Sequence, residues 1–475
     1  MQRNSTTDAS IELRWNYPRR VHLVGVGGAG MQSLANVLVG FGWDVSGSDI
    51  RGDALRELQG RGVAIHTGHN ALVVTDDIEV VIHSDAVGAA NVELQRAAEI
   101  DAAVYSYAEF LGLMSRESRT VAVAGTHGKS TTTAMMADVF RAAGHDPTIV
   151  LGATHLDGQP CGHAGDCSRL LVEACEYQRN FLHLHPDVAV VLGVQWDHVD
   201  CFTTLQNVED AFAQFVQCVR PNGLIVVNEA CPTARFAKRQ TMVKTVTFGQ
   251  HGTADWRAAN IRSSRGRYHF SIFNGDRLLV DVSPRVAGRH NLMNALATAA
   301  VAAESGIPAD AIREGLSSFR GLRRRLELVG NHAGVTLIDD YGHHPTEVGV
   351  TLAAVGEMYP GQRLWCIFQP HQGDRTAAML DEFARSLQLA DRVCIADVFQ
   401  ARADAGSRRA TAADLAACGR AMGANVVGVH KASEIVDLLT DALQPGDVLL
   451  TIGAGNIRNV INEWINRVRR YRATG

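Results

Sequence analysis

The chain has 475 residues, of which 46% are hydrophobic and 20% are charged, and its formal net charge is -5. This length predicts two to three domains, and the composition is that of an ordinary globular protein. Interspersed acids and bases argue against a nucleic-acid-binding surface or a polybasic membrane arm, and apolar runs such as residues 188–194 are too short to cross a bilayer.

Residues 1–118 form the first predicted block. Residues 1–15 are polar and lack the apolar stretch of a secretion signal, so we expect a cytoplasmic protein. Residues 19–50 predict a strand, a glycine turn, a helix and a second strand, and residues 77–87 predict another strand. Alternating strands and helices are typical of a parallel sheet, so the block is predicted to be α/β.

The glycine turn of this block contains Gly25, Gly27, Gly28 and Gly30. Such a turn lets backbone N–H groups approach a pyrophosphate at a helix N-terminus. Asp49 ends the next predicted strand, where a dinucleotide-binding fold holds a ribose hydroxyl. NAD, a nucleotide-sugar diphosphate and a purely structural turn all fit this pattern, so the motif alone leaves the ligand open.

Residues 119–325 form the second predicted block, again α/β. Its predicted elements are two buried strands within 168–177 and 187–200, an amphipathic helix at 207–219, an antiparallel meander at 259–286 and a helix at 289–306 that Gly306 caps. Residues 326–475 form a third α/β block. Strand ends are predicted within residues 335–348, 363–373, 392–399, 424–430 and 447–456.

The loop GTHGKST at residues 125–131 follows the first strand of the second block. Its glycines are closer together than in the usual phosphate-binding pattern G-x-x-x-x-G-K-[ST]. Backbone N–H groups of such a loop can bind an anion, Lys129 can neutralise phosphate charge, and the hydroxyl of Ser130 or Thr131 can bind Mg²⁺. The loop therefore predicts a triphosphate site, although a mere helix cap explains everything except the lysine.

Acidic and imidazole side chains follow the next two predicted strands, namely Glu173, Glu176, Asp197, His198 and Asp200. Ligands bind at the carboxyl ends of parallel strands, so we expect metal ligands among them. The presence of two nucleotide-type loops in consecutive domains limits the possible classes of function. A hydride-transfer enzyme needs no second loop and a plain NTPase needs no first one, whereas a ligase that activates a carboxylate of a nucleotide-linked substrate with ATP needs both.

Several motifs occur in the order seen in the Mur ligases, namely GVGGAGM, GTHGKSTTT, HNLMNA, RRRLE, DDYGHHPTEV, FQPH and GAGNI. The chain resembles this family from about residue 20 to its end. The resemblance implies a Rossmann-like UDP-binding domain, a central P-loop-like ATPase domain and a Rossmann-like C-terminal domain for the amino acid. It is strongest to members that join L-alanine to the lactyl carboxylate of UDP-N-acetylmuramate, through an acyl phosphate made with ATP and Mg²⁺, in peptidoglycan synthesis.

The resemblance also implies roles for individual residues. Those expected at the UDP-sugar are Gly25, Gly27, Gly28, Gly30, Ser48, Asp49 and Ser84. Those expected at ATP are Gly125, Thr126, His127, Gly128, Lys129, Ser130, Thr131, Asn294, Arg325 and Asp340. The metal ligands implied are Ser130, Glu173 and His198, the catalytic residues are Lys129, Glu173 and His198, and the residues on the amino-acid side are His343, His344 and Arg375.

Two segments depart from the family pattern. Cys175 and Tyr177 stand where an aspartate and a serine are usual. The FQPH motif, which faces the acceptor, is usually followed by an arginine and then an aromatic residue, but here it continues as Gln372-Gly373-Asp374. A murein-peptide recycling ligase stays open as an alternative, because Glu176 and Tyr177 resemble its acidic motif. A catalytically silent relative that binds the nucleotide sugar also stays open, and no nucleic-acid or membrane partner is expected.

Overall fold

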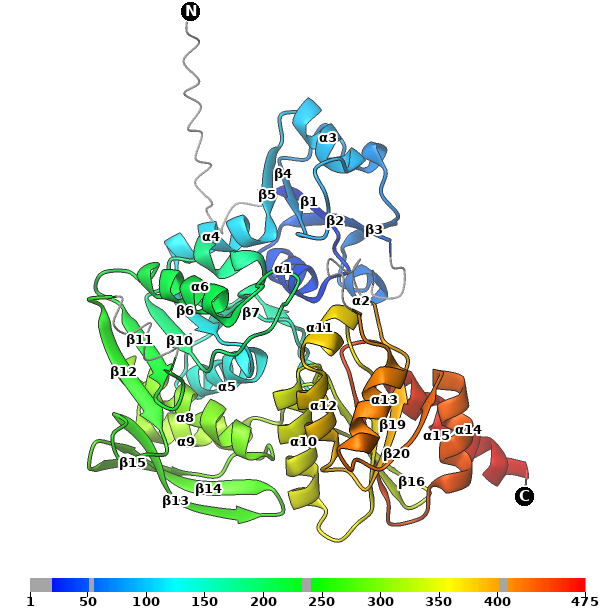
Figure 1. The fold of residues 1–475 in the computed structure, drawn as a ribbon. Coiled ribbons are helices and arrows are strands. Elements are labelled where there is room, and N and C mark those ends of the chain that lie inside the picture. Colours follow the sequence, from blue (N-terminus) through cyan, green and yellow to red (C-terminus); the bar gives the residue numbers. More distant parts are fainter. Residues whose placement is uncertain (1–18, 51–54, 233–240, 401–408, 475) are drawn as a thin grey trace, which may run out of the picture.

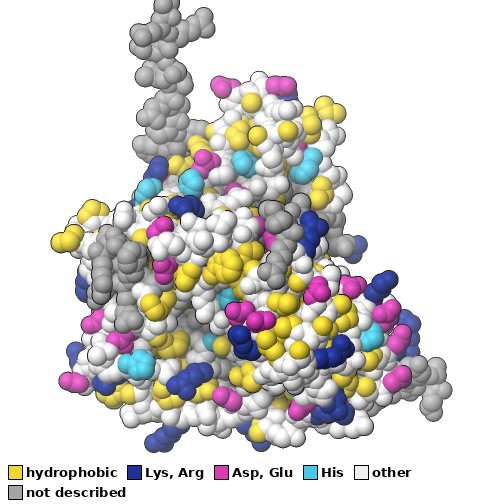
Figure 2. Space-filling view, in the orientation of Figure 1, with side chains coloured by type: hydrophobic (Ala, Val, Ile, Leu, Met, Phe, Trp, Pro, Cys, Tyr) yellow, Lys and Arg dark blue, Asp and Glu magenta, His cyan; other side chains and the backbone are white. Residues whose placement is uncertain are grey.

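The computed structural model describes residues 19–50, 55–232, 241–400 and 409–474, so the polar segment at residues 1–15 lies outside the described residues. Figure 1 shows three α/β domains that follow one another along the chain, from blue to red. The predicted fold class is confirmed. Acidic and basic side chains are interspersed on the face seen in Figure 2. Within the described residues, no helix combines the length and the apolar character that a membrane span needs.

The first domain contains a five-stranded sheet in the order β3-β2-β1-β4-β5, in which every neighbouring pair is parallel. Its strands are β1 (Arg20–Val24), β2 (Asp44–Asp49), β3 (Ala64–Thr67), β4 (Val80–His83) and β5 (Ala103–Ser106). Its helices are α1 (Ala29–Gly40), α2 (Arg56–Gln59), α3 (Val92–Glu99) and α4 (Tyr107–Glu117). The strand order reverses between β1 and β4, and ligands of such sheets bind in the crevice at this point.

The second domain contains a ten-stranded sheet in the order β15-β14-β13-β12-β11-β10-β6-β9-β7-β8. Its strands are β6 (Arg119–Ala124), β7 (Pro147–Val150), β8 (Gly162–His163), β9 (Asp166–Ala174), β10 (Val188–Val191), β11 (Leu224–Asn228), β12 (Lys244–Gly249), β13 (Trp256–Ser264), β14 (Arg267–Asn274) and β15 (Arg277–Val282). Its helices are α5 (Lys129–Ala142), α6 (Leu205–Gln217), α8 (Arg289–Glu304) and α9 (Ala309–Ser318). The predicted buried strands are β9 and β10, and the predicted meander is the antiparallel ribbon β13-β14-β15.

The third domain contains a six-stranded sheet in the order β16-β17-β21-β18-β19-β20. Its strands are β16 (Glu327–His332), β17 (Val335–Asp340), β18 (Leu364–Phe368), β19 (Arg392–Ala396), β20 (Val426–His430) and β21 (Val448–Ile452). Its helices are α10 (Pro345–Met358), α11 (Gly373–Ala378), α12 (Leu380–Leu387), α13 (Ala412–Ala421), α14 (Ala432–Ala442) and α15 (Arg458–Thr474). All strand pairs are parallel except β16 with β17, and the sequence analysis did not foresee this antiparallel edge.

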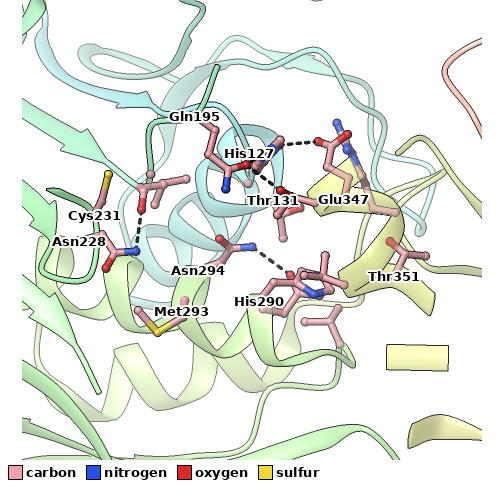
Figure 3. A pocket seen from close by; sticks show the side chains of 18 of the residues that line it. His127, Thr131, Gln195, Asn228, Cys231, His290, Met293, Asn294, Glu347 and Thr351 are labelled. Atoms are coloured by element: carbon pink, nitrogen blue, oxygen red, sulfur yellow. Dashed lines mark hydrogen bonds and ion pairs between the residues drawn. The ribbon is translucent and has the colours of Figure 1, made fainter. Parts of the chain in front are cut away.

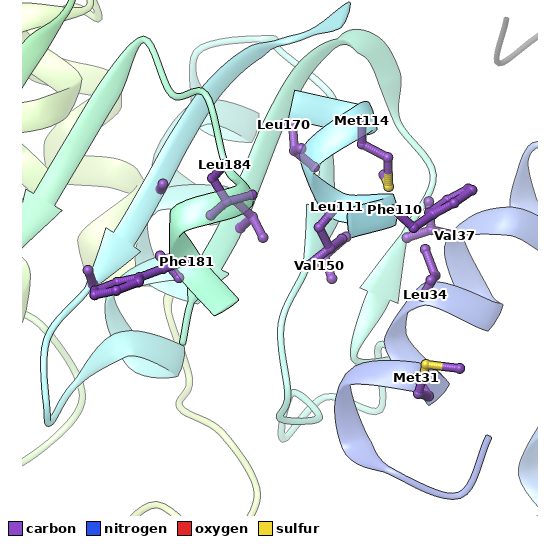
Figure 4. Packing of buried hydrophobic residues seen from close by; sticks show 14 of the residues in the cluster. Met31, Leu34, Val37, Phe110, Leu111, Met114, Val150, Leu170, Phe181 and Leu184 are labelled. Carbon is purple, nitrogen blue, oxygen red and sulfur yellow. The ribbon is translucent and has the colours of Figure 1, made fainter. Parts of the chain in front are cut away.

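A continuous hydrophobic cluster joins the first domain to the second. Phe110 of α4 lies beside Leu34 and Val37 of α1, and the same cluster continues into Val150 and Leu170 of the second sheet (Figure 4). Burial of large apolar side chains is the main favourable term in folding, so this cluster couples the two domains energetically.

Phe110 allows this coupling to be tested. It is fully buried and packs edge-on against Trp43, so Phe110→Ala should destabilise the protein by about 3–5 kcal/mol through lost burial and a residual cavity. We expect a lower urea midpoint in circular dichroism. Val104→Ala, at an exposed position of the same domain, serves as the control. A wild-type midpoint for Phe110→Ala would show that the cluster does not couple the domains.

Candidate active site

A glycine-rich loop connects β6 to α5 at the carboxyl edge of the second sheet. Gly125 and Gly128 have φ angles of 140° and 83°, and a Cβ on Gly128 would lie 2.6 Å from Asn294 Oδ1. Glycine is the residue that tolerates this backbone so close to a neighbour. The loop leads directly into α5, whose first backbone N–H groups have no intrahelical acceptors, so this helix start can bind an anion.

Lys129 is held against this loop by Glu176. Its Nζ donates to Glu176 Oε2 at 2.9 Å and to the carbonyl oxygen of Gly125 at 2.5 Å. Burial alone would lower the pKa of Lys129, but the Glu176 carboxylate outweighs burial and raises it. The ammonium group therefore stays charged at neutral pH, beside a loop that can bind an anion.

Glu173 lies near the end of β9, and His198 follows β10; these two strands flank β6, so both residues lie at the same edge of the sheet. Glu173 Oε2 accepts a hydrogen bond from the backbone N–H of Gly152 at 3.2 Å. Among the described residues, Glu173 Oε1 and His198 Nδ1 are buried without any hydrogen-bond partner. Burial lowers the pKa of His198, which favours the neutral imidazole that binds cations.

These unpartnered atoms fit a divalent cation by their chemistry. Across the described part of the chain, however, no group of three or more His, Cys, Asp or Glu is placed to hold a metal. The predicted metal ligands Ser130, Glu173 and His198 thus stay a prediction.

A cavity of about 410 Å³ lies between the loop and the third domain (Figure 3). Six residues predicted at ATP line it, namely His127, Gly128, Thr131, Asn294, Arg325 and Asp340. The other four, Gly125, Thr126, Lys129 and Ser130, belong to the loop but not to the cavity wall. Its size and its mixture of apolar and polar walls suit a nucleoside.

Asp340 contributes a buried carboxyl group to this cavity from the end of β17. Its oxygens accept hydrogen bonds from the backbone N–H groups of Leu326 and Gly342, both at 2.8 Å. Burial raises the pKa of Asp340 to about 6. Arg325 stacks over the Tyr341 ring at 5.1 Å and also lines the cavity, so the second and third domains both supply its walls.

Charged pairs join the second domain to the third beside this cavity. Arg375 Nε donates to Asp197 Oδ1 at 2.8 Å, and both side chains are almost fully buried. His127 Nδ1 lies 3.0 Å from Glu347 Oε1, and its Nε2 lies 2.9 Å from Gln195 Oε1. These contacts place the third domain directly against the glycine-rich loop.

The residues predicted on the amino-acid side come together at this junction. Arg375 is paired with Asp197, and His344 accepts a hydrogen bond from the N–H of Thr346 in the first turn of α10. Burial lowers the pKa of His343 to about 3 and that of His344 to about 4. Both imidazoles are therefore neutral at physiological pH.

The residues that depart from the family pattern lie in the same region. Burial raises the pKa of the Cys175 thiol to about 12, so the position carries no charge at neutral pH. The Tyr177 ring lies 5.1 Å from the His198 ring, and its hydroxyl donates to Asp200. Gln372 is buried and has a φ angle of 68° at the start of α11.

The predicted UDP-sugar residues lie at the carboxyl edge of the first sheet. Gly27 N donates to Asp49 Oδ2 at 2.8 Å, and a Cβ on Gly30 would lie 2.9 Å from the Tyr107 hydroxyl. Ser48 is fully buried, and its hydroxyl donates to Glu93. The remaining residues of this set, Gly25, Gly28 and Ser84, lie at the carboxyl ends of β1 and β4.

Some residues at the junction carried no assigned role in the sequence analysis. Glu347 both pairs with His127 and caps α10, and its position in the helix-start pattern was a usable signal. Gln195 contacts His127 and Thr346, but no motif around Gln195 in the sequence indicated these contacts. Glu176 was foreseen as a candidate acid, whereas its pairing with Lys129 was not.

Comparison with known proteins covers all three domains. Three family models match, described as Mur ligase family, catalytic domain (residues 20–119), Mur ligase middle domain (123–302) and Mur ligase, glutamate ligase domain (324–455). A solved structure of the UDP-N-acetylmuramate-alanine ligase from Thermotoga maritima superimposes with a TM-score of 0.80 at 26% identity, covering 96% of this chain and 100% of that one. The chain therefore belongs to the Mur ligase family.

Within the family, similar relatives share one name. The UDP-N-acetylmuramate–L-alanine ligase of Roseiflexus sp. (strain RS-1) is 39% identical over 455 residues, which cover 92% of this chain and 96% of the relative. The enzyme of the same name from Clostridium novyi (strain NT) is 36% identical over 447 residues, with 93% and 96% coverage. A murein peptide ligase from Psychrobacter arcticus shares the fold, with a TM-score of 0.72 at 23% identity.

The His127–Glu347 pair makes the domain junction sensitive to pH. Burial alone would lower the pKa of His127, but Glu347 raises it above the ordinary value of 6.5. Because this pKa is raised in the folded protein, the ion pair contributes its full stabilisation below pH 6.5. The stabilisation is lost as the pH rises through the pKa that His127 has in the folded protein. Loss of this contact should let the second and third domains separate. We therefore expect the radius of gyration, measured by small-angle X-ray scattering, to increase as the pH rises through this pKa.

Glu347→Gln should remove this pH dependence, and Glu382→Gln, at an exposed position of α12, should keep it. An equally pH-dependent radius in Glu347→Gln would contradict the assignment.

Proposed function

We propose that this protein is an ATP-dependent ligase that joins L-alanine to the lactyl carboxylate of UDP-N-acetylmuramate during cytoplasmic peptidoglycan synthesis. The observation that carries the proposal is the pairing of two glycine loops at the carboxyl edges of two consecutive sheets, the second with a charged Lys129 beside it. The shared name of relatives that match almost the whole chain supports this substrate pair.

The proposed reaction has two steps. A lactyl carboxylate oxygen attacks the terminal phosphorus of ATP, ADP leaves, and the carboxyl group becomes an acyl phosphate. The uncharged amine of L-alanine then attacks the carbonyl carbon, phosphate leaves, and the amine loses a proton. Activation is required because a free carboxylate is a poor electrophile. Catalysis consists mainly of positioning and charge stabilisation.

Different residues of this chain would carry out the positioning and the charge stabilisation. The N–H groups at the start of α5 hold phosphate oxygens, and Lys129 exchanges its contact with Glu176 for the transferred group. Ser130, Glu173 and His198 would hold Mg²⁺, which neutralises phosphate charge when bound. His343, His344 and Arg375 lie on the acceptor side, and the closed junction keeps water from the acyl phosphate.

A panel of acceptors tests this proposal. Phosphate release from ATP is measured with Mg²⁺ and UDP-N-acetylmuramate, in separate reactions with L-alanine, glycine, L-serine and a tripeptide. We expect release that depends on L-alanine. Release with the tripeptide alone would instead indicate a murein-peptide recycling ligase, which Glu176 and Tyr177 make the second candidate. If no acceptor causes phosphate release although the protein binds the UDP-sugar, the protein would be a catalytically silent relative.

Lys129→Ala tests the division of labour between the first two domains. The variant should lower kcat by about a hundredfold to a thousandfold, because it removes a cation from the developing charge. UDP-sugar binding, measured by calorimetry, should stay at the wild-type level. Lys244→Ala, at an exposed lysine of the same domain, is the control. Equal loss of turnover and of UDP-sugar binding would refute this division.

Glu173→Ala tests the metal assignment. The variant should raise the Mg²⁺ concentration for half-maximal activity by about tenfold to a hundredfold, since it removes a carboxylate ligand. The measurement is a Mg²⁺ titration of turnover at saturating ATP. Asp210→Ala, on exposed α6 surface, should leave the titration unchanged. An unchanged curve for Glu173→Ala would exclude Glu173 from the metal site.

A further inference from the structure

A buried carboxylate lies at the carboxyl edge of the first sheet. Glu93 lies in the first turn of α3 and is fully buried. Its Oε2 accepts a hydrogen bond from Ser48 Oγ at 2.5 Å and lies 3.2 Å from His69 Nδ1, and its Oε1 accepts a hydrogen bond from the N–H of Asn70 at 3.0 Å. A buried carboxylate with this many partners is an organised feature, because an unpaired one would be very costly.

The partners of Glu93 determine its charge and the proton position on His69. Burial alone would raise the pKa of Glu93, but the His22 ring, whose Nε2 lies 3.6 Å away, and hydrogen bonds from Ser48 and Asn70 lower it to about 2. An ionised carboxylate only accepts hydrogen bonds, so its contact with His69 requires a proton on Nδ1. The other ring nitrogen, Nε2, is then available to a ligand.

The Glu93 cluster also joins the two sides of the strand-order reversal. Glu93 comes from the helix after β4, whereas Ser48 lies in β2 and His69 follows β3, on the opposite side of the strand-order reversal. Of the side chains around the carboxylate, those of Glu93 and His22 are fully buried, whereas His69 is 25% exposed. His69 is therefore the member of the cluster that can reach a ligand.

We propose that His69 contacts the nucleoside end of the nucleotide sugar and that Glu93 is the residue that positions it. The inference rests on the proposed function, since it takes UDP as the ligand of the first domain. The glycine loop after β1 suits the diphosphate, and in sheets of this type the nucleoside extends over the ends of the next strands. His69 follows β3 on that side, and its Nε2 can donate or accept a hydrogen bond with a uracil edge or a ribose hydroxyl.

Calorimetric titration of UDP into the full-length protein tests the inference. His69→Ala and Glu93→Gln should each weaken UDP binding by about tenfold, the loss expected for one hydrogen bond to an organised polar group. His69→Asn keeps a hydrogen-bond donor toward Glu93 but has no group in place of Nε2, so it should bind UDP as weakly as His69→Ala. Glu99→Gln, at an exposed position of α3, is the matched control and should bind like the wild type.

Further readouts separate positioning from a loss of folding. ADP binding should be unchanged in every variant, and KM for UDP-N-acetylmuramate should rise while kcat is retained. Wild-type UDP affinity in His69→Ala or His69→Asn would overturn the ligand contact, and wild-type affinity in Glu93→Gln would overturn the positioning role. Because His69 is partly exposed, its variants carry the test if Glu93→Gln does not fold. Absence of UDP binding in the wild-type protein, with ADP binding intact, would instead refute the proposed function.

Discussion

The buried ion pair between Asp197 and Arg375 is the contact on which the arrangement of the site depends. Both side chains are almost fully removed from water, so each charge needs the other. Asp197 follows β10 of the second domain, and Arg375 belongs to α11 of the third. Their contact brings the third domain against the glycine-rich loop, where its residues complete the nucleotide-sized cavity. Separating the domains would expose two charges and open that cavity at the same time.

A second ion pair, between Lys129 and Glu176, holds the lysine against the glycine-rich loop. The charge of Lys129 is balanced by the Glu176 carboxylate, and its ammonium group also donates to the carbonyl oxygen of Gly125. Under the proposed function a phosphate group replaces this carboxylate, and the exchange costs less than creating a new charged contact from water because the lysine is already desolvated. The first domain shows the same principle, since Glu93 is fully buried yet held by hydrogen bonds to its neighbours.

Local signals in the sequence predicted much of the fold and of the loops. The strand–turn–helix units of the first two domains, the meander and the phosphate-type loop each depend on residues close together in the chain, and the structure contains them. The antiparallel strand β16 was missed because its pairing depends on β17 and the sheet edge rather than on its own sequence. The contacts of His127 with Glu347 and of Arg375 with Asp197 join residues far apart in sequence, and only the packed domains reveal them.

The central claim is that ATP activates the carboxylate of the nucleotide sugar. UDP-N-acetylmuramate labelled with heavy oxygen in its lactyl carboxylate tests it directly, with the released phosphate analysed by mass spectrometry. The account predicts one labelled oxygen in that phosphate, because a carboxylate oxygen bridges to phosphorus and leaves with it when L-alanine attacks the carbonyl. Unlabelled phosphate, formed while the amide product accumulates, would contradict the account.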